Sequence, residues 1–544
     1  MSASAVNGRS RALHAVFFLS GIAGLGYQMV WMRMWSVGLG HEMPSVLAVV
    51  AAFFGGLAIG AWLLDRPVST SSRPALWYAG LEAVIGVWGL ASIVLIPWGN
   101  EWAIQWTGIN PGPLRQWTIA FVLPFASLLP ATVAMGATLP AMERVVSRLH
   151  GHARCVGGLY AANTAGAVAG VLTSTFVLVP VIGFRLTVVT LAVVNLVCAG
   201  LVLLLARRES AGTQTAARTE PPVVTPFRLA ITVFLTGVLG IGYEVLCIRV
   251  LGQVTQNTVY SFAGALIAYL MGTAAGAAAY QRWLARLPRE KFNSILGALL
   301  IALCTSMLIG VYVMSSSSQI DEWLARLLGD SLTLAVTREL IVAALVFAFP
   351  TVLMGAIFSH LVQAARHLTG GVGRATAINT LGGSLASVVF GILLLPAIGA
   401  KLAITLCALA YVALIPRFTP RFILSLAIPL MLVILSPSDL RIVSLADGSH
   451  VRTYRDGVMA AVAVIEDANG NRYLKVNNRF QMGATVGTFA EKRLGDIPLL
   501  LHPDPHSALF LGVGTGVSFG TSPEHPGLSA VGVELIPEAV ELLG

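Results

Sequence analysis

Residues 186–206 read LTVVTLAVVNLVCAGLVLLLA, an apolar stretch without a single Asp, Glu, Lys or Arg. A helix needs about 20 such residues to cross a hydrocarbon core of roughly 30 Å, and irregular backbone cannot cross it, because unpaired peptide groups are too costly in lipid. The stretch therefore predicts a membrane-spanning helix. The same lack of charge recurs in five more stretches of similar length: 44–64, 117–140, 156–181, 258–280 and 294–314.

The composition of the whole chain points the same way. Hydrophobic residues make up 56% of the 544 residues and charged residues 11%, with a mean hydropathy of +0.80. Soluble domains carry roughly 25% charged residues, so the lipid bilayer is the expected main partner of the chain. The other runs that are long enough to span it are 12–38, 75–98, 227–251, 339–362, 375–397 and 401–416, and a weaker thirteenth lies at 422–435.

The net charge of +9 does not indicate a nucleic-acid partner, because most basic residues lie in short loops between the apolar runs. Loops on the side of the N-terminus carry sixteen Arg and Lys residues and the opposite loops four, and cytoplasmic loops are the ones enriched in these residues. We therefore expect a multi-pass protein of the cell (inner) membrane with a cytoplasmic N-terminus. Twelve spans would leave the C-terminal domain in the cytoplasm and thirteen would place it outside, and the sequence leaves this choice open.

An internal repeat relates the two halves of the apolar region. Gly24-Leu-Gly-Tyr-Gln28 matches Gly240-Ile-Gly-Tyr-Glu244, and Asn163 matches Asn379, each pair being 216 residues apart. Each repeat holds six predicted spans, an even number, so the two repeats should run parallel, as in the halves of major-facilitator transporters. The expected fold is an all-α membrane bundle of two parallel six-helix repeats, 12–206 and 227–416, joined by a cytoplasmic linker at 207–226.

Four polar residues inside the predicted spans are candidate functional residues. Glu82 and Glu244 are ionisable, and such groups are costly in lipid and usually face a cavity or a partner. A polar solute route between the halves and a structural role are equal alternatives for both acids. Asn163 and Asn379 could either bond across helices or line a cavity.

The remaining intramembrane candidates have simpler interpretations. Arg33 and Arg249 lie close to the ends of their spans, and we expect them to extend toward the membrane surface. The cysteines have no metal-ligand spacing, so we expect them to be small core residues and expect no metal site: Cys155, Cys198, Cys247, Cys304 and Cys407.

The character of the chain changes after a possible thirteenth span at 417–437. Charge rises, and 458–465 and 473–476 alternate as two strands around an Asn-Gly turn in 467–471. We expect a small β-domain at 438–497. The segment 498–544 then reads as the start of a Rossmann-like α/β domain.

A glycine-rich turn in this last segment is the strongest candidate for ligand binding. Leu509-Phe-Leu-Gly512-Val-Gly514-Thr-Gly516 reads as a strand that leads into glycines, and Glu534 follows the next strand 18 residues after Gly516. In nucleotide-binding folds such glycines let the backbone approach the ligand, and the acid binds a ribose hydroxyl. A tight turn without a ligand is the alternative.

Residues from about Tyr454 to Gly544 resemble the N-terminal part of spermidine synthases. The resemblance rests on 474–481 (Leu-Lys-Val-Asn-Asn-Arg-Phe-Gln), on 497–505 (Ile-Pro-Leu-Leu-Leu-His-Pro-Asp-Pro) and on the glycine turn. The whole arrangement is similar to bacterial fused major-facilitator/spermidine synthases. The resemblance implies that Gly512, Gly514, Thr515, Gly516, Glu534 and Gln481 lie at a site for decarboxylated S-adenosylmethionine or S-adenosylmethionine.

The sequence also departs from that family. Thr515 stands where the family usually has Asp, 476–478 (Val-Asn-Asn) replaces Leu-Asp-Gly, and Asp496 replaces a His. Since polyamines are cations, the loss of acids weakens charge complementarity. The catalytic Asp of the family would lie past Gly544, so we expect either a truncated product or a domain that does not catalyse, and no catalytic residue is assigned.

Three functions are compatible with these features. The first is a membrane-embedded aminopropyltransferase-type or methyltransferase-like enzyme that acts on a polyamine or related amine. The second is a major-facilitator-like transporter of a small cationic solute, with a soluble domain that senses a nucleoside or caps the fold. The third is a structural subunit in which both parts are scaffolding.

Overall fold

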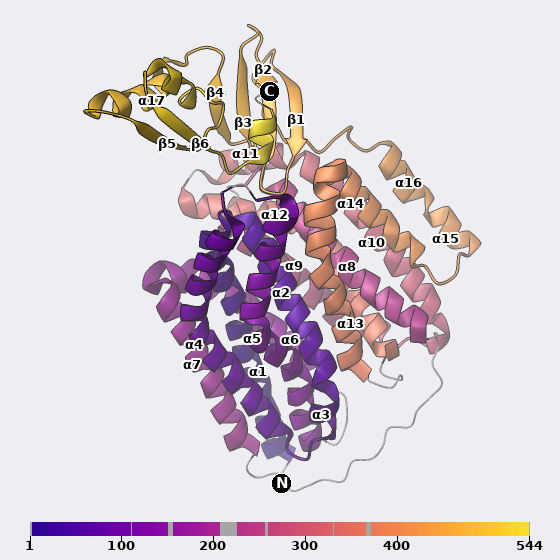
Figure 1. Ribbon diagram of the computed structural model, residues 1–544. Helices are drawn as coiled ribbons and strands as arrows, with labels where there is room; N and C mark the ends of the chain where they lie inside the picture. Colours follow the sequence, from indigo (N-terminus) through magenta and orange to yellow (C-terminus); the bar gives the residue numbers. More distant parts are fainter. Residues whose placement is uncertain are drawn as a thin grey trace.

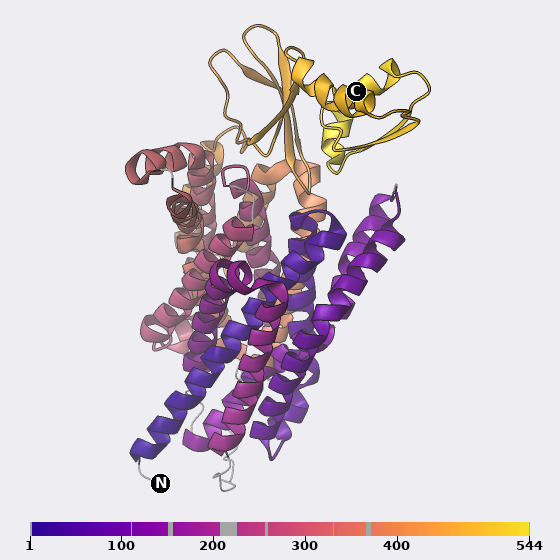
Figure 2. The same ribbon diagram turned by 90° about the vertical axis from the view of Figure 1, so that its left-hand side faces the viewer.

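The computed structural model describes residues 3–109, 111–150, 156–206, 226–255, 259–329, 331–365 and 371–542. Figure 1 shows a bundle of long helices with a mixed α/β domain seated on the end opposite the N-terminus, and Figure 2 shows the same arrangement from the side. The predicted linker lies almost entirely outside the described residues.

Long apolar helices dominate both halves of the bundle, and all twelve predicted spans fall on them. The helices of the first half are α1 (Ala3–Leu39), α2 (Glu42–Leu63), α3 (Asp65–Thr70), α4 (Pro74–Thr107), α5 (Pro113–His150), α6 (Val156–Thr173) and α7 (Val179–Ala206), with a π-helical segment at Ser174–Leu178. Those of the second half are α8 (Pro226–Leu251), α9 (Val259–Ala279), α10 (Phe292–Ser315), α11 (Ser317–Leu328), α12 (Leu332–Ala365), α13 (Gly371–Ala386) and α14 (Leu395–Ala413), with π-helical segments at Tyr280–Leu284 and Ser387–Leu394.

Ten continuous helical segments among the described residues are long and apolar enough to cross a membrane. Two of them, Gly158–Ala206 and Gly373–Ala413, have 49 and 41 residues, about twice the length that one crossing needs. Each is interrupted by a glycine with non-helical backbone, Gly183 (φ 73°) and Gly399 (φ 75°). The two predicted spans on either side of each break therefore lie within one helical segment.

Both breaks are helical hairpins. Ser174 and Leu191 stand nine and eight residues from Gly183, yet both lie against Gly26 of α1. In the second half, Phe390 lies against Gly242 of α8, and the Cys407 thiol contacts the Leu239 carbonyl of the same helix. The chain therefore reverses at each glycine, which alone tolerates the positive φ without strain.

The weak thirteenth span forms two short helices, α15 (Pro420–Ser425) and α16 (Ala427–Ile434). The Phe422 ring lies against Gly297 near the start of α10, and the Tyr312 hydroxyl near its end donates to the Leu432 carbonyl at 2.7 Å. The segment therefore follows α10 over about 22 Å of its length. As a result, the C-terminal domain and the N-terminus lie at opposite ends of the bundle (Figures 1 and 2).

Matched glycines of the two halves make matched contacts. A Cβ added at Gly21 or at Gly237 would clash with the carbonyl of Asn163 or Asn379. A Cβ added at Gly60 or at Gly276 would likewise clash with the backbone carbonyl of Val133 or Val352. Small residues at these positions let helices α1 and α6, α8 and α13, α2 and α5, and α9 and α12 pack closely.

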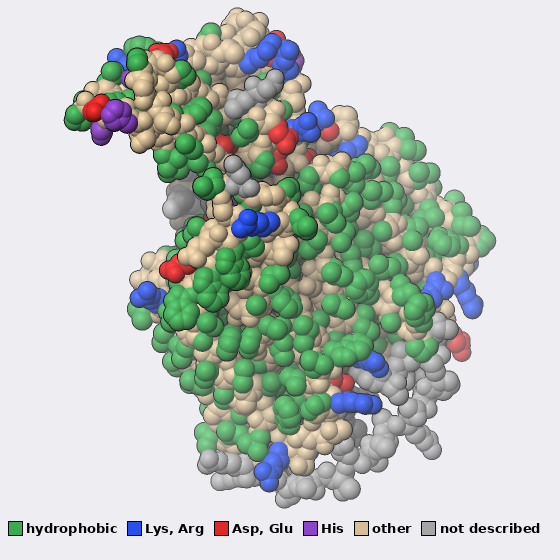
Figure 3. Space-filling view, viewed as in Figure 1, with side chains coloured by type: hydrophobic (Ala, Val, Ile, Leu, Met, Phe, Trp, Pro, Cys, Tyr) green, Lys and Arg blue, Asp and Glu red, His purple; other side chains and the backbone are tan. Residues whose placement is uncertain are grey.

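The two halves meet through two equivalent helix pairs. Helix α2 of the first half packs on α13 of the second, and α6 of the first packs on α9 of the second. Helices α2 and α9 occupy matching places in the repeat, as do α6 and α13. Apolar side chains cover the visible flank of the bundle, and charged side chains gather toward its ends and on the α/β domain (Figure 3), as a bilayer requires.

The C-terminal domain contains a four-stranded antiparallel sheet in the order β1-β2-β3-β4: β1 (His450–Asp456), β2 (Ala461–Glu466), β3 (Arg472–Val476) and β4 (Phe480–Ala484). The predicted hairpin is β2–β3, whose turn places Gly470 at φ 80°. The strand predicted from Val458 begins at Ala461, and β1 was not predicted, because exposed charged residues interrupt its alternation.

A two-stranded parallel sheet follows, formed by β5 (Ser507–Leu511) and β6 (Ser529–Val533). Helix α17 (Phe489–Leu501) precedes it, and the short helix α18 (Pro537–Glu541) follows it. Between the two strands the chain forms the glycine turn and a 3-10 segment, Phe519–Glu524, where a Rossmann unit would have an α-helix.

Candidate functional site

A cavity lies between the two halves, near the end of the bundle that carries the α/β domain. Helices α1 and α2 line one side, and α8, α9 and α12 line the other. The volume open to the centre of a water-sized sphere is about 40 Å³, so in this conformation the cavity has room for a few water molecules.

The cavity continues toward the centre of the bundle. A deeper, narrower space shares Met43, Val46, Ile248 and Phe262 with the first one and reaches Glu244 on α8. Glu244 is 7% exposed. In the part of the chain that the structure describes, no hydrogen-bond or ion-pair partner lies within reach of its carboxylate.

Carboxylates outnumber basic groups along this path. Three acids line it, Glu42, Glu339 and Glu244. Arg33 is the one basic lining residue among those described. Arg33 lies close enough to Glu42 for electrostatic attraction, and Ser261 donates to the Glu339 carboxylate at 2.8 Å. If all four residues are ionised, they carry a net charge of −2, so the path is suited to a cation.

Glu82, the other predicted intramembrane acid, belongs to a different environment. It is 0% exposed, and its carboxylate accepts hydrogen bonds from Ser20 and Asn195, both at 2.6 Å. These residues come from α4, α1 and α7 of the first half and do not line the cavity. Glu82 therefore ties three helices together, which is the structural alternative.

Asn163 and Asn379 occupy corresponding helix crossings. Asn379 donates from its side chain to the Val233 carbonyl at 3.0 Å and to the Thr236 hydroxyl at 3.3 Å. The backbone carbonyl of Asn163 lies against Gly21. Neither asparagine lines the cavity that contains Glu244, so the structure places the four polar candidates in four separate environments.

The glycine turn leaves open space beside two of its glycines, since no atom lies within 4 Å of the place that a Cβ would take at Gly512 or Gly516. Gly512, Gly514 and Gly516 all have positive φ, at 84°, 55° and 79°, and only glycine adopts such angles freely. The Glu534 carboxylate accepts a hydrogen bond from the Gly514 amide at 2.8 Å and from the Ile536 amide at 3.0 Å. Since a carboxylate offers about four acceptor positions, two remain for other donors.

Strand β4 lies beside this loop and brings the predicted neighbour with it. The Thr515 side chain packs directly on Gly483, and Met482 lies near Gly514. Gln481 belongs to the same strand and is exposed. All six residues predicted for the nucleoside site thus lie in one region, at the junction of the β-domain with the parallel strands.

The structure corrects the interpretation of Arg249 as a residue that extends toward the membrane surface. Its side chain is 2% exposed and donates to the Gly457 carbonyl and to the Asn477 side chain of the soluble domain. Asn477 is one of the positions that depart from the spermidine synthase pattern. Here it serves the contact between the membrane bundle and the soluble domain.

Sequence reasoning missed Glu42 and Glu339 as site residues. Glu42 lies between two predicted spans and Glu339 is the first residue of another, so neither looked like an intramembrane acid. A signal was present, because both acids lie at span ends on the side opposite the N-terminus, where basic residues are few.

No protein-family model matches this chain. A curated relative, polyamine aminopropyltransferase 2 of Streptomyces coelicolor, is 27% identical over 205 residues, which are 37% of this chain and 35% of the relative. The chain thus matches about a third of that relative's length.

Several solved structures align with much of the chain at low identity. A bacterial homologue of the human lysosomal transporter Spinster is 14% identical with a TM-score of 0.42, covering 80% of this chain and 96% of that one. The Escherichia coli fucose:proton symporter FucP has 14% identity and a TM-score of 0.43, with 77% and 98% covered. The proton:xylose symporter XylE of the major facilitator superfamily is 13% identical with a TM-score of 0.43, covering 80% of this chain and 98% of that one.

The candidate site described above rests on the residues of this chain and not on these distant likenesses. Ten described helical segments are long and apolar enough to cross a membrane, and charged side chains gather toward the ends of the bundle (Figure 3). The chain is a multi-pass membrane protein with a small antiparallel β region near its C-terminus.

Proposed function

We propose that this protein is a major-facilitator-like transporter that moves a small cationic amine through the cavity between two parallel six-helix repeats. One observation carries the proposal: the cavity is lined by both halves and holds Glu42, Glu244 and Glu339 against Arg33 alone among the described residues. The matched glycine contacts of the two halves support the repeat.

Glu244 provides the energetic reason for a cationic solute. An acid without a partner is costly inside a membrane, whether it is ionised or must hold a proton to stay neutral. A cation that enters the cavity offsets this cost through its charge and its N–H donors, whereas a neutral sugar supplies no charge. Met43, Val46 and Phe262 contribute apolar walls that are chemically compatible with the methylene chain of an aliphatic polyamine such as spermidine, and the narrow space beside them would have to widen to admit it.

The proposed orientation places the N-terminus in the cytoplasm of the cell (inner) membrane and the α/β domain on the outside. The excess of basic residues in the loops on the side of the N-terminus favours a cytoplasmic N-terminus. The α/β domain lies at the opposite end of the bundle (Figure 1) and would then be outside. We expect Asn469→Cys, in the exposed β2–β3 turn, to react with a membrane-impermeant maleimide in intact cells. Reaction only after the cells are permeabilised would reverse the orientation.

The α/β domain supports a second candidate function, binding of an adenosylmethionine-type nucleoside and aminopropyl transfer to an amine. The three positive-φ glycines with Glu534 favour the nucleoside. The similarity to a polyamine aminopropyltransferase is compatible with an amine substrate. The nucleoside would lie over Gly512 to Gly516 with its ribose toward Glu534, and Gln481 would lie nearby.

Uptake of labelled spermidine into liposomes that contain the purified chain tests the transport function. We expect saturable uptake that is inhibited by unlabelled putrescine and is unaffected by glucose, because only the former carries the charge that the cavity attracts. Uptake equal to that of protein-free liposomes would refute the proposal.

A further inference from the structure

One wall of the cavity is also the seat of the soluble domain. At the end of α8 and in the turn that follows, Ile248, Leu251, Gly252 and Thr255 line the cavity. The residues between them, 249, 253 and 254, make hydrogen bonds to the soluble domain. The segment 248–255, called here the cavity wall, is therefore in contact with the cavity on one side and with the soluble domain on the other.

Arg249 occupies a socket that the β-domain builds for it. Its Nε and Nη2 donate to the Gly457 carbonyl at 3.3 and 3.1 Å, and its Nη1 donates to the Asn477 Oδ1 at 3.2 Å. The same Asn477 oxygen accepts from the Ala461 amide at 2.9 Å, and Asn477 has a φ of 48°. The socket is thus formed by Gly457 from the β1–β2 connection and Asn477 from the β3–β4 turn, and the pairing of the four strands holds these two connections in place.

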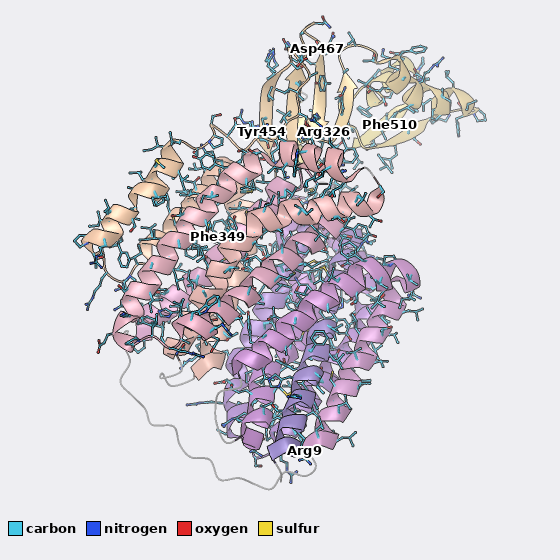
Figure 4. All side chains as sticks on the ribbon, turned by 180° about the vertical axis from the view of Figure 1, so that it is seen from behind. Arg9, Arg326, Phe349, Tyr454, Asp467 and Phe510 are labelled. Carbon is cyan, nitrogen blue, oxygen red and sulfur yellow. The ribbon has the colours of Figure 1, made fainter. Side chains whose placement is uncertain are left out.

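Two further contacts hold the other end of the wall. Burial raises the pKa of Tyr454, so its hydroxyl keeps its proton. The hydroxyl lies 3.2 Å from the Gln253 Oε1 and 2.9 Å from the Asp456 Oδ1, and its one proton is shared between these two acceptors. Arg479 donates to the Val254 carbonyl at 2.9 Å. Figure 4 places Tyr454 at the base of the β-domain, where it meets the helices.

We propose that the soluble domain is a clamp that holds the cavity wall in one position and so controls access to the cavity. The clamp rests on the proposed transport function, since Thr255 and Leu251 line the cavity through which the solute would pass. An element with two discrete positions is biased by whatever binds one of them better. The seated domain binds one position of the wall through hydrogen bonds at residues 249, 253 and 254.

A cysteine at Thr255 reports the position of the wall. Thr255 lines the cavity and is 5% exposed. The reporter Thr255→Cys is made together with Cys155→Ser, because the other four cysteines are buried. Tyr454→Phe with Arg479→Ala then removes the contacts to Gln253 and Val254, together with the bond from Tyr454 to Asp456, and leaves the residues of the Arg249 socket unchanged. We expect the reaction of the reporter with a maleimide to accelerate about tenfold, the effect of losing roughly two hydrogen bonds.

Arg452→Ala is the matched control, because the Arg452 side chain is 50% exposed and pairs with Glu466 within the sheet rather than with the cavity wall. It should leave the reaction rate unchanged. An equal rate in the double variant, with an unaltered thermal unfolding midpoint, would overturn the clamp. Labelling needs no solute, so an accelerated rate without spermidine uptake by the wild type would retain the clamp and refute only the transport function.

Discussion

Glu244→Gln is expected to lower spermidine uptake by about tenfold or more, because it removes a charge-assisted contact worth about 1–3 kcal/mol and keeps the shape of the side chain. Glu244 is the deepest acid of the cavity. Thermal stability in detergent should be unchanged or higher, since a neutral amide is less costly to bury than a carboxylate. The measurement is the initial rate of uptake into liposomes at a fixed internal volume.

Glu322→Gln is the matched control for this variant. Glu322 lies on α11 with a side chain that is 65% exposed, in an i,i+4 pair with Arg326, so the same charge is removed outside the cavity. Uptake by this control should equal that of the wild type. Normal uptake by Glu244→Gln, or unfolding of that variant, would assign Glu244 a structural role.

Glu534→Ala is expected to weaken binding of an adenosylmethionine-type nucleoside by roughly 5- to 150-fold, the range that corresponds to about 1–3 kcal/mol for buried polar groups left unpaired. Two acceptor positions of the carboxylate are used by the Gly514 and Ile536 amides, and the ribose hydroxyls would use the others. Calorimetry on the full chain with S-adenosylmethionine and its decarboxylated form measures this.

Glu541→Ala controls for the loss of one acid in the same region, since Glu541 is an exposed residue of α18. Its affinity for the nucleoside should match that of the wild type. No binding to the wild type at millimolar nucleoside, or equal binding by Glu534→Ala, would show that the three glycines form only a turn.

The sequence predicted the bundle well because its strongest signals are local. Charge-free runs mark helices in lipid regardless of their neighbours. Glycines such as Gly60 and Gly276 repeat because each lets a backbone carbonyl of another helix approach within contact distance. The weak run at 422–435 was harder to interpret, because it is split into two short helices and follows α10 rather than forming one long helix.

The cavity and the clamp could not be predicted because they depend on residues far apart in the chain. Arg249 meets Gly457, 208 residues later, and no span-end rule anticipates a buried partner in a soluble domain. Glu42 and Glu339 look like ordinary loop-side acids until α1, α2, α9 and α12 enclose one space. Glu82 and Glu244 were equivalent in the sequence, and only packing separates a helix-tying acid from a cavity acid.

The most direct test of the central claim is net uptake of labelled spermidine by liposomes containing the wild-type chain, compared with the Glu244→Gln variant at equal protein content. The account predicts saturable uptake by the wild type and a loss of about tenfold in the variant, with putrescine competing and glucose inert. Uptake by the wild type that does not exceed the leak of protein-free liposomes, or that is equal in the variant, would contradict it.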